Sequence, residues 1–303
     1  MQPKLEGFAA ALLGSLDGAV LATVARDFAS LEQTILSNPD LHGMLTDTSI
    51  APVARGRVFQ DLLDGKVHAV TSQLAVYAAR VVPAQDVPHA IADLASSIHL
   101  IQETGSQEFA SLGLLAARER ISGYADALLD QVDTSNFTQV EEDLFRWAHI
   151  VRNNQELRRL LSDRDAPLDQ RLAITQQLLE GKVLDIALTL IRFVVIGGRP
   201  RDVTGSIDYL VDYIARARDW RVARIHTARP LDEQSRSQLV SSLAAVTGTS
   251  VELQVARDPS LLGGLLIEVG DLRLDATTRG RLGVLRESVA AGHYAPSPSD
   301  RNE

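Results

Sequence analysis

The sequence repeats itself at an offset of 116 residues, and this repeat limits the possible folds more than any other feature. Residues 5–13 match residues 121–129, with a glycine, an aromatic residue and a leucine pair at equivalent places. The register slips by one residue between Pro52 and Pro167 and returns at Gly65 and Gly181, as expected for a loop. We therefore expect two copies of one domain of about 110 residues, which is a common domain size. The offset also relates two sets of four residues: Asn38, Leu41, Leu45 and Asp47, and Asn154, Leu157, Leu161 and Asp163.

Each copy has the apolar periodicity of a helical bundle. In the second copy, a single apolar stripe at helical spacing consists of Ile121, Ala125, Leu128 and Val132. Residues 183–196 are apolar nearly all round, which predicts a buried central helix. The other helices of this copy are expected over residues 137–151, 167–179 and 203–218, and Gly181 is expected to end the second of these.

Beyond Trp220 the apolar pattern alternates, which predicts strands. The expected strands cover residues 221–227, 251–255, 265–269 and 272–274, and a helix over 231–246 connects the first two. Asp232 and Glu233 stand near the positive N-terminal end of that helix.

A turn at Gly270-Asp271 is expected between the last two strands. Thr277 or Thr278 is expected to start a final helix that runs to about Ala290. The tail from Gly292 is rich in proline and serine and is expected to be disordered.

We therefore predict an α+β chain that is mainly α. Two tandem helical bundles of about six helices each precede a small C-terminal α/β domain with a mixed four-stranded sheet. The expected domains are residues 1–112 (the first repeat), 113–219 (the second repeat) and 220–291 (the α/β domain), with a disordered tail over 292–303.

Charge and composition argue against several classes of protein. The formal net charge of −9 argues against nucleic-acid binding, because that function needs a basic face. The chain has no cysteine, which excludes disulfides, thiolate nucleophiles and cysteine-based metal sites. The N-terminus lacks the pattern of a signal peptide, and residues 183–196 are fewer than the roughly 20 that a membrane helix needs. We expect any membrane association to come through a partner.

No pattern of catalytic or metal-binding residues stands out. No two of the seven histidines lie three or four residues apart, so a helical metal pair is not expected. A Gly-x-Ser-x-Gly elbow and a phosphate-binding loop do not occur, and Gly263-Gly264 is interpreted as close backbone packing at a strand start. We expect no cofactor, no metal and no catalytic residue. The predicted function is a scaffold that takes an amphipathic partner helix into a groove between two of its helices.

A long motif runs from Asp258 to Leu282. It contains an apolar pair, two glycines, an apolar strand, Gly-Asp, a short strand, an aspartate and then Arg-Gly-Arg-Leu. This motif resembles the C-terminal signature of the delta-subunit family of bacterial F-type ATP synthases, which is related to the mitochondrial oligomycin-sensitivity-conferring protein. The signature residues are Gly263, Gly264, Gly270, Asp271, Asp275, Arg279, Gly280 and Arg281.

The second repeat is similar to the N-terminal helical domain of the same family. Residues 120–129 resemble its first helix, and Gly198-Arg199 stands where the family has Gly-Arg after its fifth helix. The resemblance covers residues 116–291 and implies a non-catalytic stator subunit that resists rotor torque. It implies a helical domain that grips the N-terminal helix of an alpha subunit, an α/β domain that binds the b-type stalk, and a peripheral location on the cytoplasmic face of the bacterial cell membrane. The family's groove, between its first and fifth helices, points to Tyr124, Ala125, Leu128, Leu188, Ile191 and Val195.

The first repeat departs from the family pattern, because most members lack it. Phe8 stands at the place of Tyr124, and Val82-Pro83 replaces the Gly-Arg after the fifth helix. The chain is similar to lengthened delta subunits of some bacteria, which are sometimes fused behind a b-type stalk helix. Which repeat meets the alpha subunit stays open. Two alternatives also stay open: a helical-repeat adaptor of another complex, and an enzyme with an unrecognised site.

Overall fold

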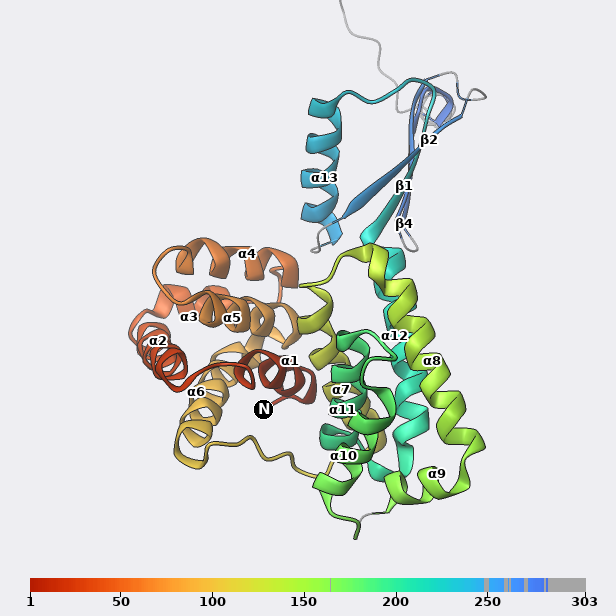
Figure 1. Ribbon diagram of the computed structural model, residues 1–303. Coiled ribbons are helices and arrows are strands. Elements are labelled where there is room, and N and C mark those ends of the chain that lie inside the picture. Colours follow the sequence, from red (N-terminus) through yellow and green to blue (C-terminus); the bar gives the residue numbers. More distant parts are fainter. Residues whose placement is uncertain are drawn as a thin grey trace, which may run out of the picture. The chain divides into compact units, whose positions relative to one another are not determined.

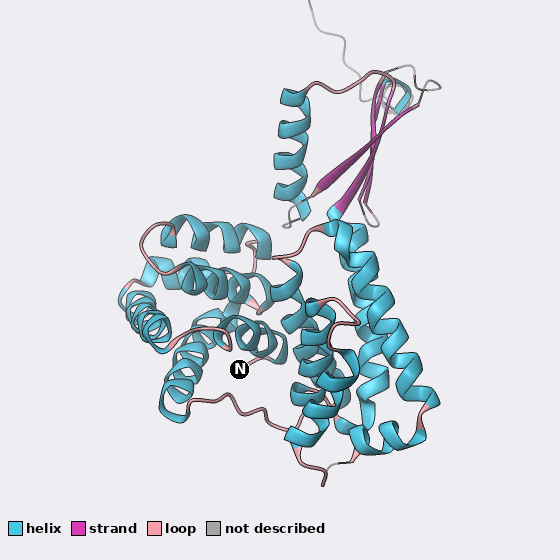
Figure 2. Cartoon of the chain, in the orientation of Figure 1, coloured by secondary structure: helices cyan, strands magenta, loops and turns pink. Residues whose placement is uncertain are grey.

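The structure is a computed structural model, and it describes residues 1–163, 165–247, 251–258, 261, 263–269, 272–280 and 282. The chain divides into two compact units, Met1–Ile214 and Ala215–Glu303. The first unit is helical, and the second contains a small sheet (Figures 1 and 2). The prediction of a mainly helical chain with a small C-terminal sheet is confirmed.

Helices fill the first repeat, and polar side chains cap several of them. The amide of Val20 donates to Asp17 at 2.8 Å at the start of α2, and the amide of Leu41 donates to Asn38 at 3.1 Å at the start of α3. Gly105 has a φ of 69° and ends α6. The helices are α1 (Pro3–Leu13), α2 (Gly18–Ser37), α3 (Pro39–Thr46), α4 (Pro52–Leu63), α5 (Ala69–Val81) and α6 (Val87–Thr104), with a 3-10 turn η1 (Ala84–Asp86).

The second repeat has the same series of elements. They are α7 (Leu114–Leu129), α8 (Phe137–Asn153), α9 (Gln155–Ser162), α10 (Leu168–Leu179), α11 (Asp185–Gly197) and α12 (Val203–Arg221), with 3-10 turns η2 (Thr134–Asn136) and η3 (Pro200–Asp202). The bounds of α9, α10 and α11 lie 116 residues after those of α3, α4 and α5. Gly65 and Gly181 follow α4 and α10 with φ values of 65° and 69°. The prediction that Gly181 stands at the end of α10 is therefore confirmed.

Helix α9 corrects the sequence analysis, which names no helix over residues 155–162. The amide of Leu157 donates to Asn154 at 3.0 Å, so the helix starts at the residue equivalent to Asn38. Only Leu157 and Leu161 of its eight residues are buried. Leu157, Leu160 and Leu161 have helical spacing, but a segment of eight residues is shorter than the window in which apolar periodicity is judged, and this explains why the helix was not predicted.

Helix α7 buries two faces, whereas the sequence predicts a single apolar stripe. Ile121 and Ala125 of that stripe are fully buried, but Val132 lies beyond the end of the helix. The second buried face contains Gly123 and Ala127 and packs against the first repeat. Helices α1 and α7 pack together more extensively than any other pair of elements in the described chain.

The start of the predicted central helix, α11, depends on a buried carboxylate. The amide of Leu184 donates to Asp143 of α8 at 2.8 Å, which satisfies a free N–H at the start of α11. The first repeat uses the same device at the start of α5, where the amide of His68 donates to Asp27 at 2.8 Å. The predicted burial of α11 is confirmed, because most of its side chains are in the core.

The second unit has a sheet with strand order β2-β1-β3-β4. Strand β1 is parallel to β2 and antiparallel to β3, and β3 is antiparallel to β4. Ile225 and Ile267 are paired across β1 and β3 and share a core with Leu243 of α13. The elements are β1 (Val222–Thr227), α13 (Glu233–Thr247), β2 (Glu252–Arg257), β3 (Gly264–Val269) and β4 (Leu272–Thr277). The predicted Gly270-Asp271 turn, most of the final helix and the 292–303 tail lie outside the described residues.

Candidate partner-binding site

The two repeats meet where α1 crosses α7, and two glycines allow the crossing. A Cβ atom on Gly7 would lie 1.8 Å from the carbonyl oxygen of Arg120, and a Cβ on Gly123 would lie 1.8 Å from that of Lys4. The contacts are reciprocal, because both the glycines and the contacted residues are 116 positions apart. Reciprocal contact between equivalent surfaces is the arrangement of a symmetric dimer interface, and here it lies within one chain.

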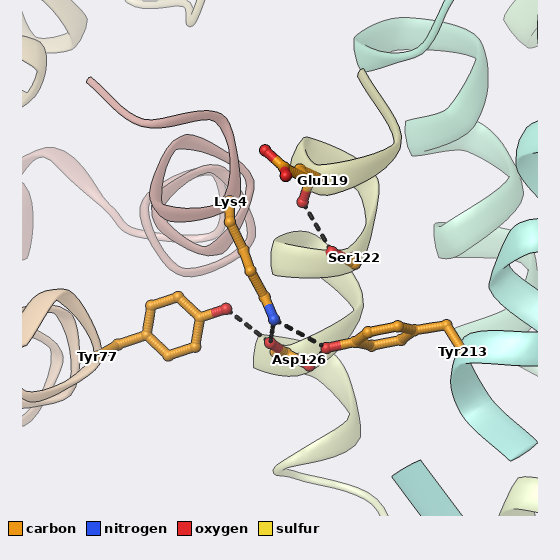
Figure 3. Close-up of polar contacts among 6 residues, drawn as sticks. All are labelled: Lys4, Tyr77, Glu119, Ser122, Asp126 and Tyr213. Carbon is orange, nitrogen blue, oxygen red and sulfur yellow. Dashed lines mark hydrogen bonds and ion pairs between the residues drawn. The ribbon is translucent and has the colours of Figure 1, made fainter. Parts of the chain in front are cut away.

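Beside the crossing, Asp126 of α7 contacts three side chains from other helices (Figure 3). Tyr77 of α5 donates to its Oδ2 at 2.6 Å, and Tyr213 of α12 donates to its Oδ1. The Nζ of Lys4 lies 3.4 Å from Oδ2 and donates to the Tyr213 hydroxyl at 3.2 Å. Burial raises the pKa of the Tyr77 phenol well above its ordinary value, and the Asp126 charge raises it further. We call these four residues the Asp126 cluster, and it links α1 and α5 to α7 and α12.

The predicted groove lies between α7 and α11, where two aromatic rings stack. The ring centroids of Tyr124 and Phe193 are 3.7 Å apart, with 8° between their planes. In the first repeat Phe8 and Tyr77 stack in the same way, at 3.6 Å and 6°. Corresponding members of the two pairs are 116 residues apart, so this edge occurs once in each repeat. We call it the aromatic edge of that repeat.

The six predicted groove residues divide by burial. Tyr124 and Leu128 of α7 are half-buried, so part of each side chain is accessible. Burial raises the pKa of the Tyr124 phenol, and the nearby Arg192 opposes this. The other four line the interior of the second repeat, with exposed fractions of 9% or less: Ala125, Leu188, Ile191 and Val195.

Phe193 belongs to the aromatic edge, although the sequence analysis did not select it. Residues 183–196 are apolar nearly all round, so their sequence does not indicate which face of α11 lies beside α7. The repeat offered a signal, because Phe193 stands 116 residues after Tyr77 and both positions are aromatic. Comparing aromatic positions between the copies would have identified it.

The aromatic edge of the first repeat borders a cavity of about 160 Å³. Phe8 and Leu12 of α1 line it together with Val76 and Tyr77 of α5, and the C-terminal end of α7 closes one side. The lining is mixed, because polar side chains complete it: Gln73, Arg80, Asp130 and Gln131. This cavity exists only because the two repeats pack together.

Two of the signature glycines allow β3 to begin in close contact with β4. Gly264 has a φ of 82°, and a Cβ there would lie 2.3 Å from the carbonyl oxygen of Ala276. The carbonyl of Gly263 accepts a hydrogen bond from the amide of Thr278 at 2.9 Å. Both contacts agree with the interpretation of these glycines as close backbone packing at a strand start.

Other signature residues hold the end of β4. Asp275 Oδ1 accepts hydrogen bonds from the Thr277 amide at 2.9 Å and from the Thr277 hydroxyl at 2.6 Å. The hydroxyl of Thr277 in turn accepts a hydrogen bond from the amide of Gly280 at 3.0 Å. The bonds to Asp275 lower the pKa of its carboxyl below the ordinary 3.8. Arg279 is exposed, while Gly270, Asp271 and Arg281 lie outside the described residues.

The described residues contain no helix that is both long and apolar enough to cross a membrane. The same residues contain no group of three or more His, Cys, Asp or Glu side chains that could hold a metal ion.

Comparisons with known proteins place this chain in a family. The family model described as ATP synthase delta (OSCP) subunit matches residues 121–289. The ATP synthase subunit delta of Nocardia farcinica is 30% identical over 286 residues, covering 94% of this chain and 95% of the relative. That of Salinispora arenicola is 28% identical over 277 residues, covering 91% of each. A chain of the Toxoplasma gondii mitochondrial ATP synthase hexamer is 19% identical, with a TM-score of 0.27, over 60% of this chain and 98% of that chain.

These matches and the fold define a non-catalytic structural subunit of a multi-subunit complex. The chain belongs to the ATP synthase delta (OSCP) subunit family. Members of this family are components of the peripheral stalk of F-type ATP synthase. The family model begins at residue 121, whereas the bacterial relatives also match most of the first repeat.

Proposed function

We propose that this chain joins the catalytic head of the ATP synthase to its stalk through two separate contacts. The helical unit binds the N-terminal helix of an alpha subunit, and the C-terminal unit binds a b-type stalk subunit. The division of the chain into two compact units supports this assignment, because each contact has its own folded body. Two modest contacts within one complex reinforce each other through effective concentration, so neither needs to be very tight. The chain then sits peripherally on the cytoplasmic face of the bacterial membrane, held by its partners.

The observation that carries the head contact is the aromatic edge of the second repeat. Tyr124 and Leu128 are four residues apart on α7, so they lie on the same side of the helix. Phe193 of α11 is only 4% exposed and supports the Tyr124 ring by stacking on it. An amphipathic helix binds by placing apolar residues at helical spacing against such a surface. The buried Ala125, Leu188, Ile191 and Val195 support the edge from within the repeat.

We further propose that the helical part is a duplicated domain, with copies at residues 1–112 and 113–219. The recurrence of helix bounds at the offset of the sequence repeat supports this. The α/β domain is assigned to residues 220–291 and the tail to 292–303. The mixed arrangement of parallel and antiparallel pairs in the sheet supports one small domain with a β-α-β start.

Calorimetric titration tests the head contact. The intact chain is titrated with a synthetic peptide of the N-terminal helix of the alpha subunit from the same organism. Tyr124→Ala is expected to weaken binding at least about tenfold, because aromatic residues are common interface hot spots. Phe145→Ala, on the exposed surface of α8, is the matched control and should leave binding unchanged. Phe8→Ala reports on the first repeat, and loss of binding in that variant alone would move the contact there. No binding to the intact chain would contradict the assignment.

A further inference from the structure

The segment between α6 and α7 lies against the aromatic edge of the second repeat. We call residues 106–113 the strap. The ring of Phe109 contacts that of Phe193 edge to face, with centroids 5.5 Å apart and 89° between the planes. Since Tyr124 stacks on another side of Phe193, the strap, α11 and α7 contribute to one aromatic cluster. Part of the apolar surface offered to a partner helix is therefore already in contact with this chain.

A buried arginine holds the strap in place. The side chain of Arg120 on α7 is 2% exposed, and its Nη2 donates to the carbonyl oxygen of Ala110 at 3.0 Å. Its guanidinium lies 5.2 Å from the centre of the Phe109 ring, within the range of a cation–π contact. Its Nη1 lies 3.4 Å from Glu6 Oε2 on α1. One side chain thus ties the strap to both helices of the crossing.

The two aromatic edges differ in what lies beside them. The Phe8–Tyr77 pair of the first repeat borders a cavity of about 160 Å³. The Tyr124–Phe193 pair of the second repeat is contacted by Phe109. Phe8 and Tyr77 are buried, with exposed fractions of 4% and 9%, whereas Tyr124 of the second repeat is half-buried. The edge of the second repeat is therefore the more accessible of the two, and the strap contacts it.

We propose that the strap is an intramolecular competitor of the partner helix at the second repeat. Phe109 leaves Phe193 when a partner helix packs fully against Tyr124. This inference rests on the proposed function, because it assigns a regulation to the same edge. A protein whose binding-competent state is only partly populated binds with an affinity reduced by that fraction. One aromatic contact changes an equilibrium constant by about three- to tenfold, so the strap tunes the affinity without abolishing binding.

Titration of single variants tests the competition. The intact chain is titrated with the alpha-subunit peptide as wild type, Phe109→Ala, Phe145→Ala and Tyr124→Ala. Loss of the Phe109 ring is expected to tighten binding about three- to tenfold, whereas Phe145→Ala binds like the wild type. If Phe109→Ala binds the peptide as the wild type does or more weakly, and Tyr124→Ala still binds more weakly, the proposed competition by the strap is wrong. The proposed head contact is then still supported. If neither the wild type nor Phe109→Ala binds the peptide, the proposed head contact fails and the inference fails with it.

A spin label detects displacement of the strap directly. The chain has no cysteine, so Ala110→Cys introduces one labelling site and keeps the backbone carbonyl that Arg120 binds. The label at residue 110 is expected to become more mobile when the peptide saturates the protein. A label at Asp61→Cys, on the exposed face of α4, should not change. A strap label that stays immobile at peptide saturation contradicts the proposal even if affinities shift.

Discussion

The hydroxyl of Tyr77 donates a hydrogen bond of 2.6 Å to Asp126, and this bond joins the first repeat to the second (Figure 3). Asp126 accepts a second hydrogen bond from the Tyr213 hydroxyl and forms an ion pair with Lys4. Tyr77 is 9% exposed, so its hydroxyl has little access to water as an alternative partner. The bond therefore helps to hold the two repeats together in one compact unit.

Replacing Asp126 with alanine should destabilise the helical unit. The change removes the acceptor of two phenols and costs roughly 1–3 kcal/mol, because the buried Tyr77 hydroxyl is left unsatisfied. Urea denaturation followed by circular dichroism measures the free energy of unfolding. Asp61→Ala removes a carboxylate from the exposed face of α4 and is the control. Equal stability of the two variants would show that the Asp126 cluster contributes nothing measurable.

Substitution of a glycine where α1 crosses α7 should destabilise the protein, whereas substitution of a glycine with open space around it should not. Gly7→Ala and Gly123→Ala each place a Cβ 1.8 Å from a carbonyl oxygen, so the helices must separate. Forced overpacking of this kind costs about 1–3 kcal/mol or more. Gly43→Ala in α3 meets nothing within 4 Å and should stabilise the protein by about 0.5–1 kcal/mol through helix propensity. Thermal melting compares the three variants, and a neutral Gly123→Ala would contradict close contact between α1 and α7.

Two equivalent buried arginines should differ in their contribution to stability. Arg55 donates to the carbonyls of Ala79 and Val82 at 2.8 and 3.1 Å, at the C-terminal end of α5. Arg171 stands at the equivalent place, but its Nε and Nη1 have no hydrogen-bond partner in the described structure. Arg55→Met is expected to lower the free energy of unfolding by about 1–3 kcal/mol, because two buried carbonyl groups lose their donor. Arg171→Met should stay within about 1 kcal/mol of the wild type, because replacing a poorly satisfied buried charge is often neutral or favourable. Equal losses in urea denaturation would contradict the difference.

The signature residue Asp275 should titrate below its ordinary pKa. The hydrogen bonds from Thr277 lower the pKa of this carboxyl below 3.8. Because the folded pKa is depressed, its contribution to stability is present above 3.8 and is lost as the pH falls through the folded value. Carbon-13 NMR titration of the Asp275 carboxyl measures its pKa in the folded protein. Thr277→Val removes the hydroxyl and should raise the pKa towards 3.8, whereas Thr278→Val should not. A Thr277→Val value identical to the wild type would assign the shift to another cause.

The sequence predicts most elements of the second repeat and the C-terminal sheet, because both have clear periodicity. The crossing of α1 and α7 could not be predicted in the same way. Gly7 and Gly123 occupy equivalent places in the matched segments, but periodicity identifies apolar faces and not which faces meet. The contact joins residues more than a hundred positions apart, so no local pattern encodes it.

The partner-binding residues stay a prediction, and the structure shows only how accessible they are. Tyr124 and Leu128 are partly accessible, whereas Ile191 and Val195 lie in the interior. A helix that is apolar nearly all round gives no sign of which residues it buries, and this explains the choice of interior positions. The strap contact of Phe109 depends on Arg120, a charged residue whose burial the sequence does not indicate.

Deletion of residues 221–303 tests the central claim that head and stalk contacts lie on separate units. The truncated chain keeps the whole of the first compact unit, Met1–Ile214, so its fold should survive. Purified catalytic head and b-type stalk subunit from the same organism are each mixed with the intact and truncated chains, and complexes are separated by gel filtration. The account predicts that the truncated chain binds the head like the intact chain and no longer binds the stalk. Retained stalk binding, or loss of head binding by a folded truncated chain, would contradict it.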